Sequence, residues 1–165
     1  MKAVEFIRTS LDNSANMALA LLDDMKDQPL TCPTPKGGNH PLWVMGHLAW
    51  VEGQMLQLML GEPNPLAHWK DLFGTGSEPS ANASRYPSFD EVRKAFKERR
   101  AETIRLLDTL SDADLDKPSK DCPPQFKKLV GTYGQCFFVA IANTMTHCGQ
   151  VADARRAAGR KVLAM

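Results

Sequence analysis

Apolar residues recur at helical spacing in several long segments, and the first two of these segments predict amphipathic helices. In Val4–Met25, apolar positions three and four residues apart form one stripe along a helix. In His40–Leu60, Asn39 can cap the helix and Pro41 fits its first turn, while Gly61 is a typical stop. We therefore expect both segments to be helices that bury one face.

Two later segments each begin with a capping box, which predicts the start of a helix. In this motif a Ser or Thr is followed three residues later by Glu or Gln. The first box, Ser88–Glu91, opens a helix that we expect to end near Leu110. The second box, Thr132–Gln135, opens a helix that we expect to run to Ala158 and to stop at Gly159. The chain therefore has four predicted long helices.

The segments between these helices differ in length and composition. Lys26–Asn39 is a linker rich in Pro and Gly, Ser111–Asp114 starts a short turn, and Cys122–Gly131 is expected to be a loop. Gly61–Pro87 is longer than most connections within a compact domain, and we expect part of it to pack back onto the helices. The apolar residues that favour this packing are Trp69, Leu72 and Phe73.

The pattern contains no strand signal, and the predicted fold is therefore all-α, a four-helix bundle in one domain spanning 1–165. For the third helix the expected inward residues are Phe89, Val92, Phe96, Ile104 and Leu107. Its basic residues alternate with acids, which is most simply a solvated face. These residues are Arg93, Lys94, Lys97, Arg99 and Arg100.

Charge and cysteine usage narrow the class of protein. The formal net charge is +1, so the chain has no electrostatic footprint for nucleic acid. The most apolar stretch, Leu42–Leu60, is too short and too polar to span a membrane, and the N-terminus has no signal-peptide pattern. The four cysteines show no CxxC pair or framework spacing. We expect a cytoplasmic protein with no nucleic-acid or membrane partner.

Two histidines lie on inward faces of predicted helices. His47 shares its face with mostly apolar residues, namely Trp43, Val44, Trp50, Val51 and Leu58, together with His40 and Gln54. His147 shares its face with Asn143, one turn away at i,i+4. A pair from one helix and one ligand from a facing helix can surround a divalent ion, with Gln54 and Gln150 orienting the imidazoles. The alternative is two core histidines that only hydrogen-bond.

Other candidate residues have simpler explanations. His40 is expected to cap its helix or lie at the surface, and His68 to be exposed. Cys136 lies too far along its helix from His147 to share an ion, and Cys148 is expected to be a small buried residue. No residue is evident as a general base, and the catalytic residues are unknown.

Several motifs resemble the DinB-like family, and their order covers nearly the whole chain. Gly46–Glu52 and Thr146–Val151 resemble its two signature segments, while Trp69–Gly74, Tyr86–Ser88 and Arg155–Gly159 fit neighbouring positions. The resemblance implies an up-down-down-up bundle that is often a homodimer. The 61–87 connection is long enough to cross the bundle and let the second and third helices run parallel. The resemblance also implies a zinc or nickel ion held by three histidines, of which two correspond to His47 and His147, whereas the third falls on Asn143.

Two functional hypotheses follow. In the first, a divalent ion at His47, His147 and Asn143 serves a metal-dependent thiol transferase or hydrolase; some relatives use bacillithiol, mycothiol or glutathione. In the second, a non-catalytic, stress-related binding or interaction protein has lost tight metal binding, because an amide oxygen binds zinc or nickel less well than imidazole. The substrate, a small molecule or a thiol, is not named by the sequence.

Overall fold

A computed structural model describes residues 1–31 and 38–163. Its four long helices are α1 (Ala3–Asp23), α2 (Pro41–Leu60), α4 (Phe89–Leu107) and α6 (Tyr133–Ala157). The described residues form no strand, although Pro118 and Thr132 make an isolated antiparallel bridge. The all-α prediction is therefore confirmed for this part of the chain. None of the described helices is long and apolar enough to cross a membrane.

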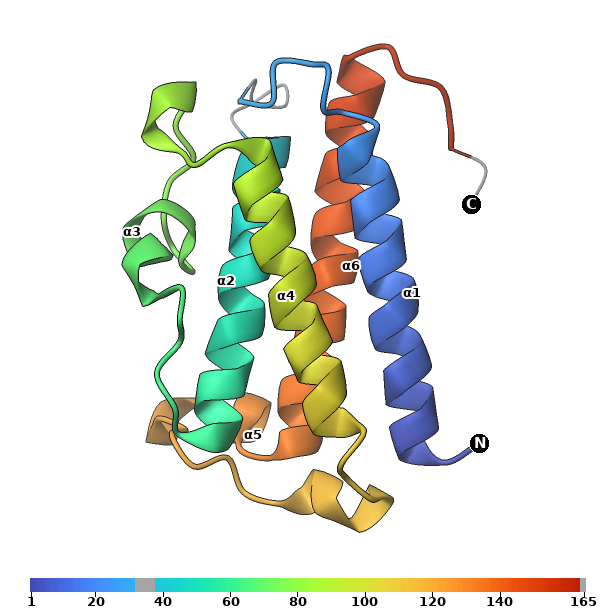
Figure 1. Ribbon diagram of the computed structural model, residues 1–165, viewed down its shortest axis with the longest axis vertical. Helices are drawn as coiled ribbons and strands as arrows, with labels where there is room; N and C mark the ends of the chain where they lie inside the picture. Colours follow the sequence, from blue (N-terminus) through green and yellow to red (C-terminus); the bar gives the residue numbers. More distant parts are fainter. Residues whose placement is uncertain (32–37, 164–165) are drawn as a thin grey trace.

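The four long helices lie side by side, with α1 and α6 running in one direction and α2 and α4 in the other (Figure 1). Helix α2 packs against both α4 and α6, and α1 packs against the other sides of α6 and α4. Because α2 and α4 run the same way, the chain between them must return along the full height of the helices. The 61–87 connection makes this return along the outer side of α2 (Figure 1).

Residues at the ends of the helices determine where each helix begins or stops. Gly61 ends α2 in the left-handed conformation, with φ of 73°, as the sequence predicted. The predicted cap at Asn39 is wrong, because His40 occupies the cap position and its Nδ1 accepts a hydrogen bond from the Trp43 backbone N–H at 3.0 Å. Ser88 and Thr132 both form the predicted capping boxes.

The 61–87 connection is held against α2 by close contacts at two glycines. A Cβ atom at Gly46 would lie 2.3 Å from the ring of Phe73, and one at Gly53 would lie 2.1 Å from the amide oxygen of Asn64. The helical turn α3 (Lys70–Phe73) therefore packs where α2 has no side chain. Trp69 and Phe73 are buried, which confirms that this connection packs back onto the helices.

Two other connections differ from the prediction or fall partly outside the description. The segment Cys122–Gly131 is not a plain loop, because Pro124–Phe126 forms a 3-10 turn and α5 (Lys127–Val130) is a short helix. In the linker Lys26–Asn39, residues 32–37, including Cys32, lie outside the described residues.

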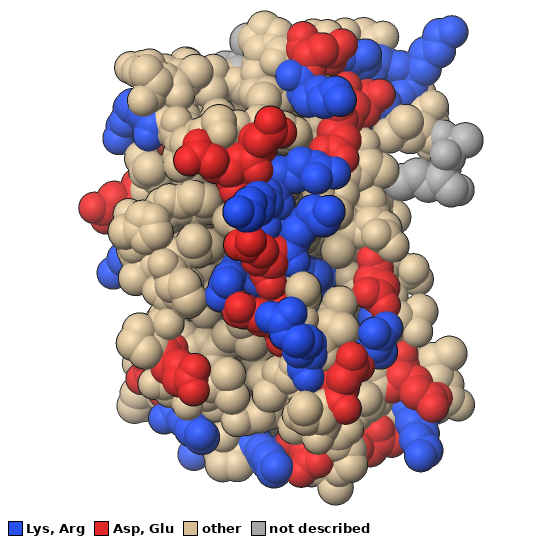
Figure 2. All heavy atoms as spheres, viewed as in Figure 1, with Lys and Arg blue, Asp and Glu red and all other residues tan. Residues whose placement is uncertain are grey.

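The polar face predicted for α4 is only partly correct. Val92, Phe96 and Leu107 are buried as predicted, and Figure 2 shows a band of alternating basic and acidic side chains over α4. Arg100, however, was predicted to be solvated and is 4% exposed. It lies on the inward side of α4, one turn beyond Phe96, where its guanidinium packs 5.5 Å from the Phe96 ring centroid.

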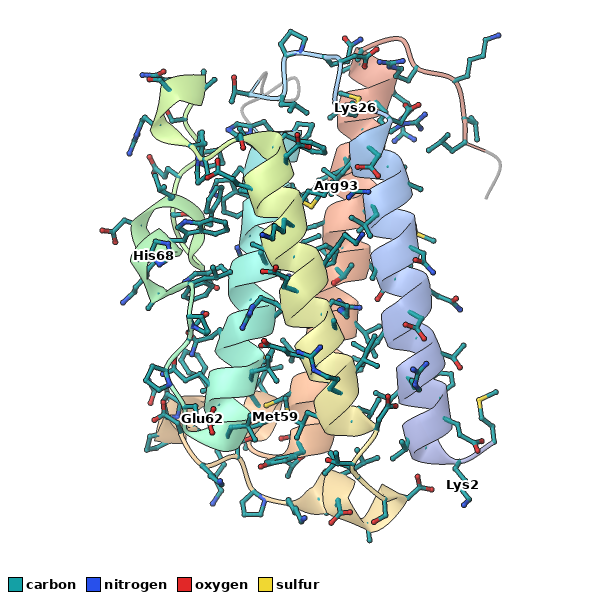
Figure 3. All side chains as sticks on the ribbon, viewed as in Figure 1. Lys2, Lys26, Met59, Glu62, His68 and Arg93 are labelled. Atoms are coloured by element: carbon teal, nitrogen blue, oxygen red, sulfur yellow. The ribbon has the colours of Figure 1, made fainter. Side chains whose placement is uncertain are left out.

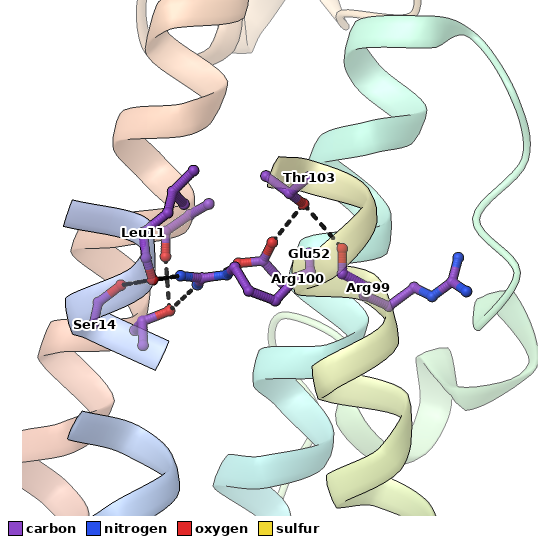
Figure 4. A network of polar contacts seen from close by, with 8 residues as sticks. Leu11, Ser14, Glu52, Arg99, Arg100 and Thr103 are labelled. Carbon is purple, nitrogen blue, oxygen red and sulfur yellow. Dashed lines mark hydrogen bonds and ion pairs between the residues drawn. The ribbon is translucent and has the colours of Figure 1, made fainter. Parts of the chain in front are cut away.

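Arg100 joins all four long helices through a network of polar contacts (Figure 4). Its guanidinium donates to Glu52 of α2, to the Leu11 carbonyl and Ser14 hydroxyl of α1, and to the Thr144 hydroxyl of α6. These five hydrogen bonds use all five N–H donors of an arginine. The second Glu52 oxygen accepts from Thr103, so the buried pair is neutralised and its hydrogen bonds are satisfied.

Candidate functional site

The two inward histidines of the sequence analysis meet between α2 and α6. The ring centroids of His47 and His147 lie 4.7 Å apart, with an angle of 66° between the ring planes. Both side chains are buried, at 5% and 8% exposure. Two imidazoles on one zinc ion, each at the usual N–Zn distance of 2.0–2.1 Å, place their centroids about 5 Å apart. The spacing is therefore compatible with a shared ion.

The orientation of His47 is fixed by a backbone carbonyl and an aromatic ring. The Nδ1 atom lies 2.7 Å from the Phe73 carbonyl oxygen, and because a carbonyl only accepts, Nδ1 carries the proton. The indole ring of Trp43 stacks on the imidazole with centroids 4.6 Å apart, and its own N–H donates to Ser77. In the neutral ring, Nε2 therefore carries a lone pair.

His147 is oriented in the same way by a side-chain amide. Its Nδ1 lies 2.8 Å from the Gln150 amide oxygen, so here too Nδ1 donates and Nε2 keeps its lone pair. The same Gln150 oxygen accepts from the Asn39 amide at 3.0 Å. Gln150 thus contacts His147 as the sequence predicted. Gln54 instead lines a neighbouring cavity, and among the described residues it forms no hydrogen bond with either imidazole.

Both imidazoles are held neutral at physiological pH. Burial lowers the pKa of His47 to about 4. The hydrogen bond to the Phe73 carbonyl opposes this shift, and the nearby His147 adds to it. Burial also lowers the pKa of His147, against the opposing effect of Gln150. A metal ion binds the deprotonated imidazole nitrogen, so both rings are in the form that a ligand requires.

Asn143 lies beside this pair on α6. Its side chain is half-buried and lies near enough to the His47 ring to raise the pKa of that histidine. The residue also lines a cavity that extends along the α2–α6 groove. The three candidate ligands, His47, His147 and Asn143, are therefore neighbours, and each could present one neutral donor atom to the same region.

The ligand set is short of strong donors. Among residues 1–31 and 38–163, no group of three or more His, Cys, Asp or Glu side chains is placed to hold a metal ion. Any ion at this position would have two imidazole nitrogens, with the Asn143 oxygen or solvent completing its shell. Two imidazoles and an amide fit a divalent ion chemically, but less tightly than three imidazoles.

The remaining candidates lie elsewhere. His40 is buried rather than superficial, and besides capping α2 it donates from Nε2 to the Ser80 carbonyl. His68 is exposed on the outer side of the 61–87 connection (Figure 3). Cys136 and Cys148 are buried free thiols, and burial raises the pKa of each to about 11, so neither is a reactive thiolate.

Sequence reasoning missed the groups that orient the imidazoles from outside their helices. These are the Phe73 carbonyl and the Asn39 amide. The Phe73 contact had a detectable signal, because a glycine inside a helix directly before an inward histidine indicates close approach by another segment. Gly46 is such a residue, and its contact with the Phe73 ring brings the Phe73 carbonyl to His47.

Comparison with known proteins adds one match. A family model described as the DinB superfamily matches residues 10–151, which include α2, α4 and all three candidate ligands. A search of curated proteins found no match.

Proposed function

Since the chain belongs to the DinB superfamily, we propose that it binds one divalent ion, zinc or nickel, at His47 and His147, with Asn143 as a weak third ligand. The observation that carries this proposal is the pairing of two buried, neutral imidazoles whose Nδ1 atoms are both engaged. Their Nε2 atoms have no hydrogen-bond partner among the described residues. This arrangement leaves a lone pair on each ring for one shared ligand.

The chemistry that such an ion supplies is Lewis acidity, which polarises a carbonyl or lowers the pKa of a bound water or thiol. The protein's own residues supply orientation and a largely buried environment. Phe73 and Gln150 hold the two rings, and Trp43 covers the His47 face. The proposed activity is a metal-dependent thiol transfer or hydrolysis on a small molecule.

Among residues 1–31 and 38–163, no carboxylate contacts either histidine as a free general base. Glu52, the acidic residue nearest in sequence to His47, is committed to Arg100 and Thr103. In this proposal both nitrogens of each imidazole are engaged, so proton transfer would fall to solvent or to the thiol of the substrate.

The alternative is a non-catalytic, stress-related binding or interaction protein. The observation that favours it is the carboxamide at position 143, which leaves the described residues without a third strong donor. In that case the two imidazoles would serve packing and hydrogen bonding. The two functions differ in one measurable property, namely whether the protein binds an ion at His47 and His147.

We further propose that the helices form the up-down-down-up bundle of the family, in a cytoplasmic homodimer. Four apolar residues of α1 and α4, namely Phe6, Met17, Phe96 and Leu106, are candidates for a dimer surface, but not all of them are available. Phe6 is 62% exposed and Met17 and Leu106 are half-buried, but Phe96 is fully buried within one chain and cannot contact a second. Light scattering at micromolar concentration tests the dimer, and a particle of only the 18.2 kDa chain mass would contradict it.

The metal site is tested by titrating tag-free protein with zinc and nickel in a calorimeter at pH 7.5. We expect one ion per chain, with at least tenfold weaker binding in His47→Ala and in His147→Ala, because either change removes one of two imidazole ligands. His68→Ala is the matched control and should bind as the natural protein does. If the two ligand variants bind like this control, the ion is not held here and the alternative function stands.

A further inference from the structure

An apolar cavity lies close to the two histidines and reaches them through Asn143. It lies between α2, α6 and the 123–130 segment, and its volume is about 340 Å³, within the range of small-molecule sites. Asn143 is both a wall residue of this cavity and a neighbour of His47. The wall residues are Trp50, Val51, Gln54, Met55, Leu58, Thr75, Pro123, Phe126, Leu129, Val130, Val139 and Asn143.

The composition of the wall restricts what can bind. None of the wall residues is Asp, Glu, Lys, Arg or His, so a charged group placed there would lose its hydration without gaining a partner. Most of the wall is aliphatic or aromatic, which favours a hydrocarbon body. Phe126 and Leu129 are 51% and 55% exposed, so apolar side chains are also present where the cavity meets solvent.

A small number of polar groups remain for orientation. Gln54 and Asn143 contribute amides, and Thr75 contributes a hydroxyl. The indole N–H of Trp50 is buried and has no acceptor among the described residues, although buried donors nearly always have one. This N–H has almost no accessible surface, so it does not face the cavity and offers no contact to a bound molecule. The wall is therefore apolar with a few polar groups, which is the usual character of a ligand site.

We propose that this cavity binds the body of a neutral, largely hydrocarbon small molecule, and that a carbonyl-type polar group of this molecule lies at Asn143, beside the two histidines. The inference rests on the proposed function for what happens at that polar group, since the candidate ion would lie there. Binding of the hydrocarbon body depends only on the cavity and requires no ion.

The first test measures binding of N-phenyl-1-naphthylamine, a neutral apolar fluorophore, to the full chain at pH 7.5 in EDTA. We expect saturable binding of one probe per chain. Val139→Trp fills the cavity and should weaken binding at least tenfold. Ile141→Trp is the matched control, because Ile141 is also half-buried on α6 but is not a wall residue, and it should change binding less than twofold.

A rim substitution keeps the test valid if the larger side chain prevents folding. Leu129→Glu places a charge at the exposed mouth and should weaken the probe at least fivefold, whereas Phe138→Glu, at an exposed position outside the cavity, should not. Absence of saturable binding, or equal binding in each variant and its control, would overturn the inference.

The chemical class is tested by competition against the bound probe. Affinity should rise from butanamide to hexanamide by about fourfold for each buried methylene. Hexanoate should compete at least tenfold less well than hexanamide, because the cavity offers its carboxylate no cation. Equal competition by hexanoate, or no dependence on chain length, would contradict a neutral hydrocarbon ligand.

Zinc titration of the same variants separates this inference from the proposed function. Val139→Trp leaves His47, His147 and Asn143 in place and should bind zinc as the natural protein does. Zinc binding without saturable probe binding would overturn the ligand class alone. Probe binding without zinc binding would overturn the metal proposal alone, and the cavity would remain a hydrocarbon site.

Discussion

Two buried polar clusters lie within the same set of helices, and they differ in how completely their hydrogen bonds are satisfied. Around Arg100, all five guanidinium donors and both Glu52 oxygens have partners, and the contacts reach every long helix. Around His47 and His147, each ring uses one nitrogen and leaves the other without a partner among the described residues. A satisfied cluster stabilises the fold, whereas an unsatisfied one is available for a ligand.

The two clusters also differ in charge. The Arg100 cluster contains a buried ion pair, which is tolerated because each charge faces its opposite. In the part of the chain that the structure describes, no charged side chain pairs with the two histidines, and burial keeps both rings neutral by lowering the pKa of each. The first cluster therefore depends on keeping both of its members, and the second on remaining unprotonated.

The largest expected effect comes from removing one member of the charged cluster. Arg100→Leu should lower the free energy of unfolding by about 3–5 kcal/mol, because Glu52 is then left buried without a cation. The double variant Arg100→Leu, Glu52→Leu should recover part of this loss. Urea denaturation measures both, and a loss below about 1 kcal/mol in the single variant would mean that the network contributes little.

Acid should destabilise the neutral cluster. The pKa of His47 is about 4 when folded and about 6.5 in the unfolded chain, so the unfolded chain binds more protons between these values. The contribution of His47 to the free energy of unfolding should therefore be fully present above pH 6.5. It should fall by about 3 kcal/mol as the pH drops to 4.

The effect of His47 is isolated by comparing urea midpoints of the natural protein and His47→Gln across this range. The variant should lose less stability on acidification, because it lacks the imidazole of His47. His40 and His147 are present in both proteins, so their contributions cancel in the difference. Parallel pH profiles for the two proteins would show that His47 is not held neutral by burial.

A methyl group added at Gly46 should lower the free energy of unfolding by a smaller amount. Gly46→Ala places a methyl group 2.3 Å from the buried Phe73 ring, and such overpacking costs about 1–3 kcal/mol. Gly149→Ala is the matched control, because a Cβ atom there meets nothing within 4 Å and alanine favours a helix by up to about 1 kcal/mol. Thermal denaturation that ranked the two variants in the opposite order would contradict the close packing at Gly46.

The smallest expected effect comes from adding a third imidazole to the proposed metal site. Asn143→His should tighten zinc binding at least tenfold, because imidazole is a better donor for zinc than an amide oxygen and lies one turn from His147. Calorimetry at pH 7.5 measures the change, with Asn143→His, His147→Ala as the control in which the gain should largely disappear. Weaker or unchanged binding in Asn143→His would show that position 143 does not reach the ion.

The sequence predicted the helices well because their signals are local. The capping boxes at Ser88 and Thr132 and the stop at Gly61 each depend on a few neighbouring residues, and all three are confirmed. The errors arose where distant segments decide the outcome. Arg100 is buried only because Glu52, Ser14 and Thr144 reach it from other helices, and a charge pattern along α4 contains no information about them.

The site was predicted in the same uneven way. Helical periodicity placed His47 and His147 on inward faces, and the structure brings the two rings together. Their tautomers could not be predicted, because the Phe73 carbonyl that orients His47 comes from the 61–87 connection, whose path has no sequence period. Whether Asn143 serves as a ligand stays a prediction.

The contrast between the two clusters is tested most directly by long-range ¹H–¹⁵N spectra of the imidazole rings at pH 7.5. Both His47 and His147 should be neutral with the proton on Nδ1, whereas His40, whose Nδ1 accepts from Trp43, should carry its proton on Nε2. One equivalent of zinc should then shift both free Nε2 resonances and leave the Arg100 side-chain signals unchanged. An Nε2 proton on either His47 or His147, or rings that do not respond to zinc, would contradict the claim that both Nε2 atoms are free to bind one ion.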